Sequence, residues 1–345
     1  MNLLICTQKI DKDDDVLGFM HGWVLEFSKY FDNVTVVCLF EGKHELPINV
    51  KVLSLGKEGG RSRLKYILNF YQYIWREKNN YDAVFVHMNP EYVVLGWPIW
   101  VIMGKKITLW YNHLKGGIRL RIANLFCDRL FYTSTFAYIT RFSKSRIMPA
   151  GIDTRLFKVD SGAVRVKNSI LSLGRISPVK KVDLMVGAAI LMDQNNAEFT
   201  FDIYGNAPDR DKEYFERVKA AAANLERKAK IKFSPGISNY DTPKIYNAHE
   251  VFLNATQSGS LDKSILEAMA CGMLVLVSNK SFQNKIPDVC LFEEKNMNDL
   301  AGKLSVLLTL DEYVKNRYRS QMIEYVESEH SLTRLAVELK NALLI

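Results

Sequence analysis

The sequence predicts an α/β protein with two doubly wound, Rossmann-like domains in tandem. Short apolar runs alternate with amphipathic helical stretches, which is the pattern of a parallel sheet with helices on both faces. The alternation stops near residues 150–166 and then restarts, and 345 residues can supply two separate cores. We therefore expect a first domain at residues 1–160, a second domain at residues 161–320 and a helical tail at residues 321–345.

Each expected element follows from the local apolar pattern. In the first half, the runs typical of strands are residues 3–7, 34–39, 50–55, 83–87, 106–111, 129–133 and 146–148. The helical stretches between them are residues 19–30, 62–78, 91–103 and 118–127. In the second half, strands are expected at residues 169–173, 200–204, 231–233, 251–254 and 273–277, and helices at residues 183–193, 211–228 and 242–249.

The composition is that of a globular protein and favours an anionic partner. Hydrophobic residues make up 48% and charged residues 24%, and the net charge is +8. A basic balance suits anionic substrates or an anionic membrane face, although solvated lysines without a target are the alternative. No long basic run, RNA-recognition signature or cysteine–histidine finger is present, so nucleic acid is not an expected partner.

The cysteines and the apolar segments favour a cytoplasmic, soluble or membrane-peripheral protein. The five cysteines, at positions 6, 38, 127, 271 and 290, are odd in number and scattered, so we expect reduced, buried thiols and no zinc site. The first residues form a strand and lack the basic flank and cleavage site of a signal peptide. The most apolar stretch, residues 92–103, contains Pro98 and is shorter than the about 20 residues that span a bilayer.

The most informative segment is residues 253–279. A polar loop at residues 257–260 leads into a helix that ends at Gly272, and an apolar strand follows at once. Such a loop places backbone N–H groups and the positive end of a helix dipole at the carboxyl edge of a sheet, where phosphates bind. Inside this helix, Glu267 has only apolar neighbours, so its carboxylate is either paired or used.

This segment resembles the donor-binding signature of retaining, GT-B-type glycosyltransferases of family four. The residues Leu-Glu-Ala-Met-Ala-Cys-Gly at positions 266–272 match that signature without gaps. The junction at residues 149–157 also resembles the linker of the family. The resemblance implies two Rossmann-like domains facing a cleft, with the final helix crossing back to the first domain.

The resemblance assigns roles to several residues of the loop and helix. Glu267 would accept hydrogen bonds from the ribose hydroxyls, and the backbone N–H groups of Ser264 and Ile265 would face the phosphates. The family has a second glutamate eight residues earlier, where this sequence has Gly259. Ser260 and Asp262 are the candidates to replace that glutamate.

Two glycine-ended strands of the second half complete the expected donor site. Gly174 lets the backbone approach a ligand, and Arg175 and Lys180 follow it on one loop. Arginine binds phosphate oxygens as a fork and lysine as a point charge, so together they could neutralise a diphosphate without a metal. The family carries both at this spacing, but its usual next glycine is Lys181 here. Gly205 ends another strand and is a candidate for base or phosphate contact.

The candidates in the first half are strand-end residues. Gly18 is what remains of a glycine pair that the family uses for donor and acceptor approach. His87, Asn89 and Glu91 follow one strand and are acceptor-side candidates, and His113 follows the next. Ligands of open parallel sheets bind outside the carboxyl ends of the strands. The resemblance makes His113 a candidate contact to the reacting sugar, and a structural role is the alternative for each histidine.

The sequence thus predicts a retaining, metal-independent transferase that moves a hexose-type sugar from a nucleotide-diphosphate sugar to an acceptor, with no further cofactor. His113, Arg175 and Lys180 would carry the chemistry, and a glycan, a lipid-linked acceptor or a small molecule would receive the sugar. The alternatives are a GT-B-like nucleotide-sugar epimerase or hydrolase, and a degenerate nucleotide-sugar-binding subunit. The basic, aromatic-rich helix at residues 61–76 could also dock on anionic lipid, although we favour a core role for its apolar positions.

Overall fold

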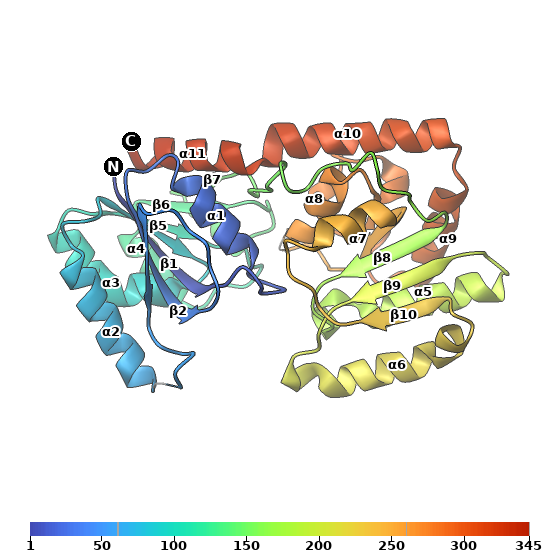
Figure 1. Ribbon diagram of the computed structural model, residues 1–345, viewed down its shortest axis with the longest axis horizontal. Coiled ribbons are helices and arrows are strands. Elements are labelled where there is room, and N and C mark those ends of the chain that lie inside the picture. The colour runs from blue at the N-terminus through green and yellow to red at the C-terminus, as the bar shows by residue number, and fades with distance from the viewer. Residues whose placement is uncertain (61, 260, 345) are drawn as a thin grey trace. The chain divides into compact units, whose positions relative to one another are not determined.

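The computed structural model describes residues 1–60, 62–259 and 261–344, and it divides into two units (Figure 1). The first unit is Met1–Gly151 together with the segment that starts at Leu332, and the second is Ile152–Ser331. The first unit ends earlier than the expected boundary at residue 160, because the segment after Gly151 packs on the second unit. Phe157 meets the ring of Tyr246 at 6.1 Å between centroids, and the Asp160 N–H donates to the Asn247 side chain at 2.9 Å.

The first unit contains one parallel sheet in the order β3-β2-β1-β4-β5-β6-β7. Every strand lies within a few residues of its predicted position, since each is a short apolar run. The strands are β1 (Leu3–Ile10), β2 (Val34–Glu41), β3 (Val50–Ser54), β4 (Ala83–His87), β5 (Lys106–Trp110), β6 (Arg129–Tyr132) and β7 (Ser145–Ile147). The order reverses between β1 and β4, which is where open α/β sheets bind ligands.

Helices cover both faces of this sheet (Figure 1). Successive residues of β1 alternate between two cores: Leu3 and Ile5 pack on one face, and Leu4 and Cys6 on the other. The first core is closed by α1 (Phe19–Phe27) and α11 (Leu332–Leu344). The second core is closed by α2 (Arg63–Arg76), α3 (Pro90–Ile102) and α4 (Ile118–Phe126).

The second unit repeats this design with a smaller parallel sheet in the order β10-β9-β8-β11-β12. Its strands are β8 (Ser169–Leu173), β9 (Thr200–Tyr204), β10 (Ile231–Ser234), β11 (Val251–Asn254) and β12 (Leu274–Val277). Its helices are α5 (Val182–Gln194), α6 (Lys212–Arg227), α7 (Thr242–Ala248), α8 (Lys263–Ala270), α9 (Met297–Thr309) and α10 (Glu312–His330). The order reverses between β8 and β11, so the second ligand-binding edge is expected there.

The helical tail consists of two helices rather than one. Ser331 separates α10 from α11, and only α11 belongs to the first unit. The expected segment at residues 321–345 therefore starts inside α10, which packs on the second unit. The apolar face of α11 contributes Leu335, Leu339 and Leu343 to the core that it shares with α1.

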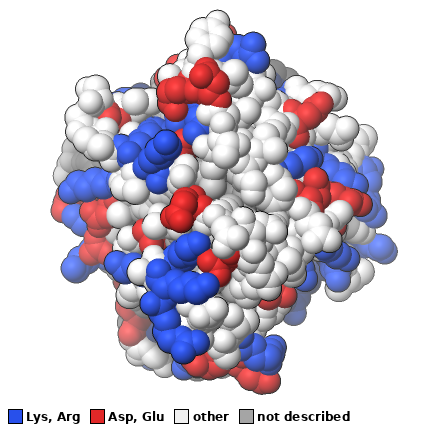
Figure 2. Space-filling view, turned by 90° about the vertical axis from the view of Figure 1, so that its right-hand side faces the viewer, with Lys and Arg blue, Asp and Glu red and all other residues white. Residues whose placement is uncertain are grey.

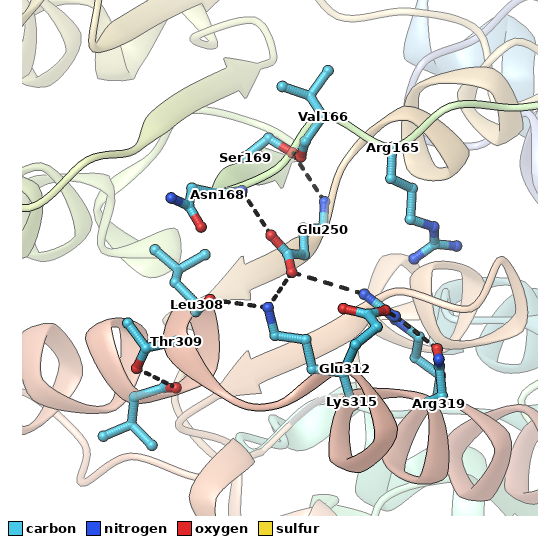
Figure 3. Close-up of polar contacts among 12 residues, drawn as sticks. Arg165, Val166, Asn168, Ser169, Glu250, Leu308, Thr309, Glu312, Lys315 and Arg319 are labelled. Atoms are coloured by element: carbon cyan, nitrogen blue, oxygen red, sulfur yellow. Dashed lines mark hydrogen bonds and ion pairs between the residues drawn. The ribbon is translucent and has the colours of Figure 1, made fainter.

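A buried ion-pair cluster holds α10 to the second sheet (Figure 3). Glu250, just before β11, pairs with Lys315 of α10, and its second oxygen accepts the Asn168 N–H at 2.7 Å. Lys315 also donates to the Leu308 carbonyl at 2.9 Å, and Arg319 lies beside the same carboxylate. The cluster lies at the amino ends of β8 and β11, opposite the ligand-binding edge, and we assign it a structural role.

The described surface carries mixed charges, and no helix in the described residues is long and apolar enough to cross a membrane. Figure 2 shows Lys and Arg interspersed with Asp and Glu on the face at the right-hand side of Figure 1. The net charge of the chain is concentrated instead in residues 61–126, which contain ten Lys and Arg against three Asp and Glu. This segment includes α2, α3 and α4.

Candidate functional site

The strand ends of the second sheet approach each other through two glycines. Gly174 follows β8 with φ +142°, a conformation that side chains rarely adopt, and Gly205 follows β9. A Cβ on Gly205 would lie 1.9 Å from the Gly174 carbonyl oxygen, so only glycine fits there. Both predicted glycines therefore bring bare backbone to the edge where β8 and β9 end.

Lys180 and Asp262 meet at this edge, from loops that are 82 residues apart in the sequence. The Lys180 ammonium pairs with the Asp262 carboxylate at 2.5 Å. The same carboxylate oxygen accepts from Asn254 at 3.0 Å and from Thr256 at 2.9 Å. Burial alone would raise the pKa of Asp262, but the Lys180 charge and these hydrogen bonds outweigh it and lower the pKa. Lys180 is thus held at the site by an ionised partner.

Arg175 and Lys180 share a small cavity at the carboxyl ends of β8 and β11. Gly174 and Asn254 also line it. The Arg175 side chain is exposed, whereas that of Lys180 is mostly covered, with 18% of it accessible. Its volume is about 10 Å³, room for a water molecule, so a diphosphate would bind across this edge rather than inside the cavity. Two cations and bare backbone at the edge suit such an anion.

The loop before α8 lies partly outside the described residues, because Ser260 is not described. Gly259 has φ +144°, which only glycine adopts readily, so the position that is glutamate in the family is shaped for glycine here. Asp262 is the N-cap residue of α8 and makes no side-chain cap. The Ile265 N–H donates to the Asp262 carbonyl at 3.2 Å inside the first turn, so this group already has a partner in the helix. Of the two N–H groups expected to face the phosphates, that of Ser264 is the remaining candidate.

The predicted end of α8 at Gly272 is confirmed. Gly272 has φ +70°, its N–H donates to the Met269 carbonyl at 2.9 Å, and the Met273 N–H donates to the Ala268 carbonyl at 3.0 Å. These two bonds form a Schellman motif, which satisfies the last carbonyls of the helix. The Arg165 guanidinium also donates hydrogen bonds to the carbonyls of Cys271 and Gly272.

Glu267 is buried and already has two hydrogen-bond donors. Its oxygens accept from Asn239 and from the Tyr246 hydroxyl, each at 3.1 Å. Burial raises the pKa of Glu267 despite these bonds, and burial lowers the pKa of the neighbouring Lys263 to about 7. Each carboxylate oxygen can accept a further bond, so a ribose contact remains compatible with this geometry.

Glu294, in the segment before α9, accepts hydrogen bonds from the same loop, and nothing in the local sequence pattern indicates it. One of its oxygens accepts the Ser258 N–H at 2.8 Å and the Ser258 hydroxyl at 2.6 Å. The Ser258 hydroxyl in turn accepts the Lys280 N–H at 2.8 Å. The sequence patterns also do not indicate Asn239 and Tyr246, which reach Glu267 from 28 and 21 residues away. Asn254 and Thr256 bond Asp262 from within the same segment, but no motif marks them.

In the first unit, the acceptor-side candidates gather where β1 and β4 end. The Asn89 amide donates to the Gln8 side chain at 3.2 Å, and Glu91 pairs with Arg119 at 2.8 Å. His87 is buried against the rings of Phe19 and Trp23, both at 5.7 Å between centroids. The burial and the ring contacts indicate packing as its main role.

Met88, between His87 and Asn89, has φ +64°, an uncommon conformation that occurs more often at functional sites. Gly18 has φ −53°, which any residue can adopt, so its backbone does not require glycine. His113 is exposed on the loop after β5, with its ring edge on Tyr111 at 5.3 Å.

The helix α2, whose apolar side chains were expected to pack in the core, buries only some of them. Phe70 and Ile74 of α2 are buried, but Leu64, Leu68 and Trp75 are 68%, 59% and 55% exposed.

In the described residues, no group of three or more His, Cys, Asp or Glu side chains is placed to hold a metal ion.

The sequence is similar to curated glycosyltransferases over part of their length. It is 23% identical to the alpha-monoglucosyldiacylglycerol synthase of Streptococcus pneumoniae over 206 residues, which are 54% of this chain and 45% of that protein. The chain thus spans less than half the length of this curated relative.

Solved structures share the whole fold. HepE of Anabaena, solved with UDP and glucose, has a TM-score of 0.79 at 16% identity and covers 100% of this chain and 99% of its own. The sucrose-phosphate synthase of Thermosynechococcus elongatus has a TM-score of 0.80 at 14% identity, with 99% and 98% covered. The fold is therefore the predicted GT-B architecture. Residues 153–328, just over half of the chain, match the family model described as glycosyl transferases group 1, and the chain belongs to this glycosyltransferase family.

Proposed function

We propose that the protein is a retaining glycosyltransferase that moves a hexose-type sugar from a nucleotide-diphosphate sugar to an acceptor. The observation that carries this proposal is that Arg175, Lys180 and the bare backbone of Gly174 come together at the end of β8. It lies in the unit that the family model matches. HepE, which shares the fold, was solved with UDP, and this favours a uridine nucleotide as the first donor to test.

In this proposal, protein cations replace a metal at the leaving group. The bond between the anomeric carbon and the diphosphate breaks, and the acceptor oxygen bonds to the same face of that carbon. The acceptor proton passes to an oxygen of the departing diphosphate. Lys180 turns from Asp262 to the diphosphate, and Arg175 binds its oxygens, so the charge that develops is met by preorganised cations. His113 is the candidate hydrogen-bond partner of the sugar.

The test compares the two cations with matched surface cations. Arg175→Ala and Lys180→Ala are expected to abolish transfer and to weaken UDP binding in isothermal titration calorimetry with EDTA present, while the fold is retained. Arg217→Ala and Lys212→Ala, which remove cations that are 64% and 68% exposed in surface pairs, are the controls. Full turnover in both site variants would remove these cations from the mechanism, and a strict requirement for Mg²⁺ would contradict metal independence.

One observation favours a second candidate, a subunit that binds nucleotide sugar without transferring it. Gly259 replaces the family glutamate, and its φ of +144° suits glycine alone, so no acid side chain reaches the donor from this position. Donor binding without release of nucleoside diphosphate would support this candidate. A nucleotide-sugar epimerase or hydrolase would instead act on the donor with no acceptor present. Such an enzyme would need carboxylates at the donor, and Glu91, the obvious candidate in the first domain, is paired with Arg119.

We also propose a glycan or lipid-linked acceptor and a cytoplasmic enzyme that touches an anionic membrane through α2. The exposed side chains of Leu64 and Trp75 lie in the segment that carries ten basic and three acidic residues. An amphipathic basic helix binds anionic lipid by burying its apolar face. The relative named for diacylglycerol supports a lipid acceptor. Sedimentation with anionic and neutral vesicles tests this, and Leu64→Glu should reduce binding to the anionic vesicles.

A further inference from the structure

The first unit contains an apolar pocket that the donor chemistry does not use. It lies between α2 and α3 and has a volume of about 260 Å³. Its wall includes Leu39, Leu55, Phe70, Tyr92 and Leu95, and Ile67 stands at its mouth. The pocket opens to solvent, and its volume is close to the lower end of the range for ligand pockets, roughly 300–1,000 Å³.

The lining of the pocket is buried at one end and exposed at the other. Phe70, Leu55 and Tyr92 are 1%, 3% and 7% exposed, whereas Ile67 is 37% exposed. The Tyr92 hydroxyl donates to the Thr7 carbonyl at 3.2 Å, so the ring alone faces the pocket. An occupant would therefore gain apolar contact at the floor without losing hydrogen bonds there.

Polar and charged residues, including the exposed Arg63, line part of the pocket. Gln8 and Asn89 line it and are joined at 3.2 Å, and Glu91 is tied to Arg119. Gln8 lies near the end of β1, Asn89 follows β4, and Glu91 is in the first turn of α3. The order of the first sheet reverses between these two strands, where a reacting polar group is expected. The pocket thus presents an apolar interior next to a polar edge, the arrangement that suits an amphiphile.

We propose that this pocket binds the apolar chain of the acceptor, with the polar head of that acceptor at Gln8 and Asn89. The inference rests on the proposed transferase function, and it specifies an acceptor that carries an alkyl-type chain. Ligand pockets usually measure roughly 300–1,000 Å³, so this pocket holds a segment of a chain rather than a whole lipid. Neighbouring residues of α2 then have different tasks: Ile67 faces the pocket, and Leu68 lies outside it.

The test uses methyl, butyl and octyl β-D-glucoside with the full chain, below the micelle concentration of the octyl compound. Binding is measured by isothermal titration calorimetry or by ligand-observed NMR. Affinity should rise at least tenfold from the methyl to the octyl compound. Ile67→Asp should lose this gain, and Leu68→Asp, on the adjacent exposed position, should keep it within about twofold. Ile67→Trp, which fills the mouth without adding charge, should behave like Ile67→Asp.

The possible outcomes separate the pocket from the donor site. An equal loss in the Ile67 and Leu68 variants, or an affinity independent of chain length, would overturn the pocket. UDP binding, measured on the same samples, should be unchanged in all variants and reports that they are folded. If UDP fails to bind the parent chain while the octyl effect and its loss in Ile67→Asp persist, the proposed function fails and the pocket stands.

Discussion

At the scale of single residues, the donor edge depends on a glycine that no residue with a side chain can replace. Gly205 accepts no side chain because a Cβ would lie 1.9 Å from the Gly174 carbonyl oxygen. The local sequence showed a glycine after a strand, but it could not show what stands opposite. The distance between two strand ends is a property of the folded sheet.

Gly205→Ala should therefore destabilise the second unit by about 1–3 kcal/mol, because backbone must move to admit the methyl group. It should also weaken UDP binding. The control is Gly302→Ala in α9, where a Cβ would meet nothing within 4 Å and alanine favours the helix by about 0.5–1 kcal/mol. Urea unfolding and calorimetry measure both effects. Equal stability of the two variants would show that the strand ends are further apart.

Lys263 gives the stability of the second unit a specific dependence on pH. Burial lowers its pKa from 10.5 to about 7, so between these values the unfolded chain binds a proton that the folded chain lacks. The free energy of unfolding must then rise with pH through this window. Lys263→Met should flatten the rise, as measured by urea unfolding between pH 7 and 9.5. A parent protein with a flat profile would contradict the low pKa.

At the scale of elements, the strands and helices were predictable because each is defined by its own apolar period. The helix caps were predictable where a special residue marks them, as at Gly272. Lys181 shows the reverse case. It stands where the family has glycine, and it adopts φ +53° and ψ +43° at the start of α5. The chain keeps the left-handed turn although the residue does not favour it.

Lys181→Gly should stabilise the protein by about 0.5–1 kcal/mol. The left-handed conformation costs an ordinary residue about 1–2 kcal/mol, and the extra backbone freedom of glycine offsets part of the gain. Lys181→Ala removes the same side chain but keeps the unfavourable φ, so it should give no gain. Thermal and urea unfolding compare the two variants. A gain in both would mean that the charge, rather than the backbone, is the cause.

At the scale of the whole molecule, the last helix completes a core whose other parts lie at the start of the chain. Leu335 of α11 is fully buried in the core that includes Trp23 and Ile5. Sequence alone suggested a helix that returns to the first domain only through a family resemblance. The structure shows the contacts, and it shows that α10 belongs to the second unit instead.

Leu335→Ala should destabilise the first unit by about 2–5 kcal/mol through the cavity it leaves. Val337→Ala, two residues along the same helix and 40% exposed, should change stability by no more than about 0.5 kcal/mol. Because the two units have separate cores, the loss should appear in the unfolding transition of the first unit. Hydrogen exchange of the strands in each unit identifies that transition. An equal effect in both units would mean that they unfold together.

The sequence by itself determined the two parallel sheets, the candidate donor loop and the cations that flank it, because the apolar periods of single elements and short motifs specify all of these. Only the tertiary structure decided that Lys180 is paired with Asp262, and that Glu267 accepts hydrogen bonds from Asn239 and Tyr246. It also decided which side of α2 faces the solvent and where an apolar pocket remains. The physical reason is that partners and burial depend on contacts between segments far apart in the chain, and local patterns do not record these contacts.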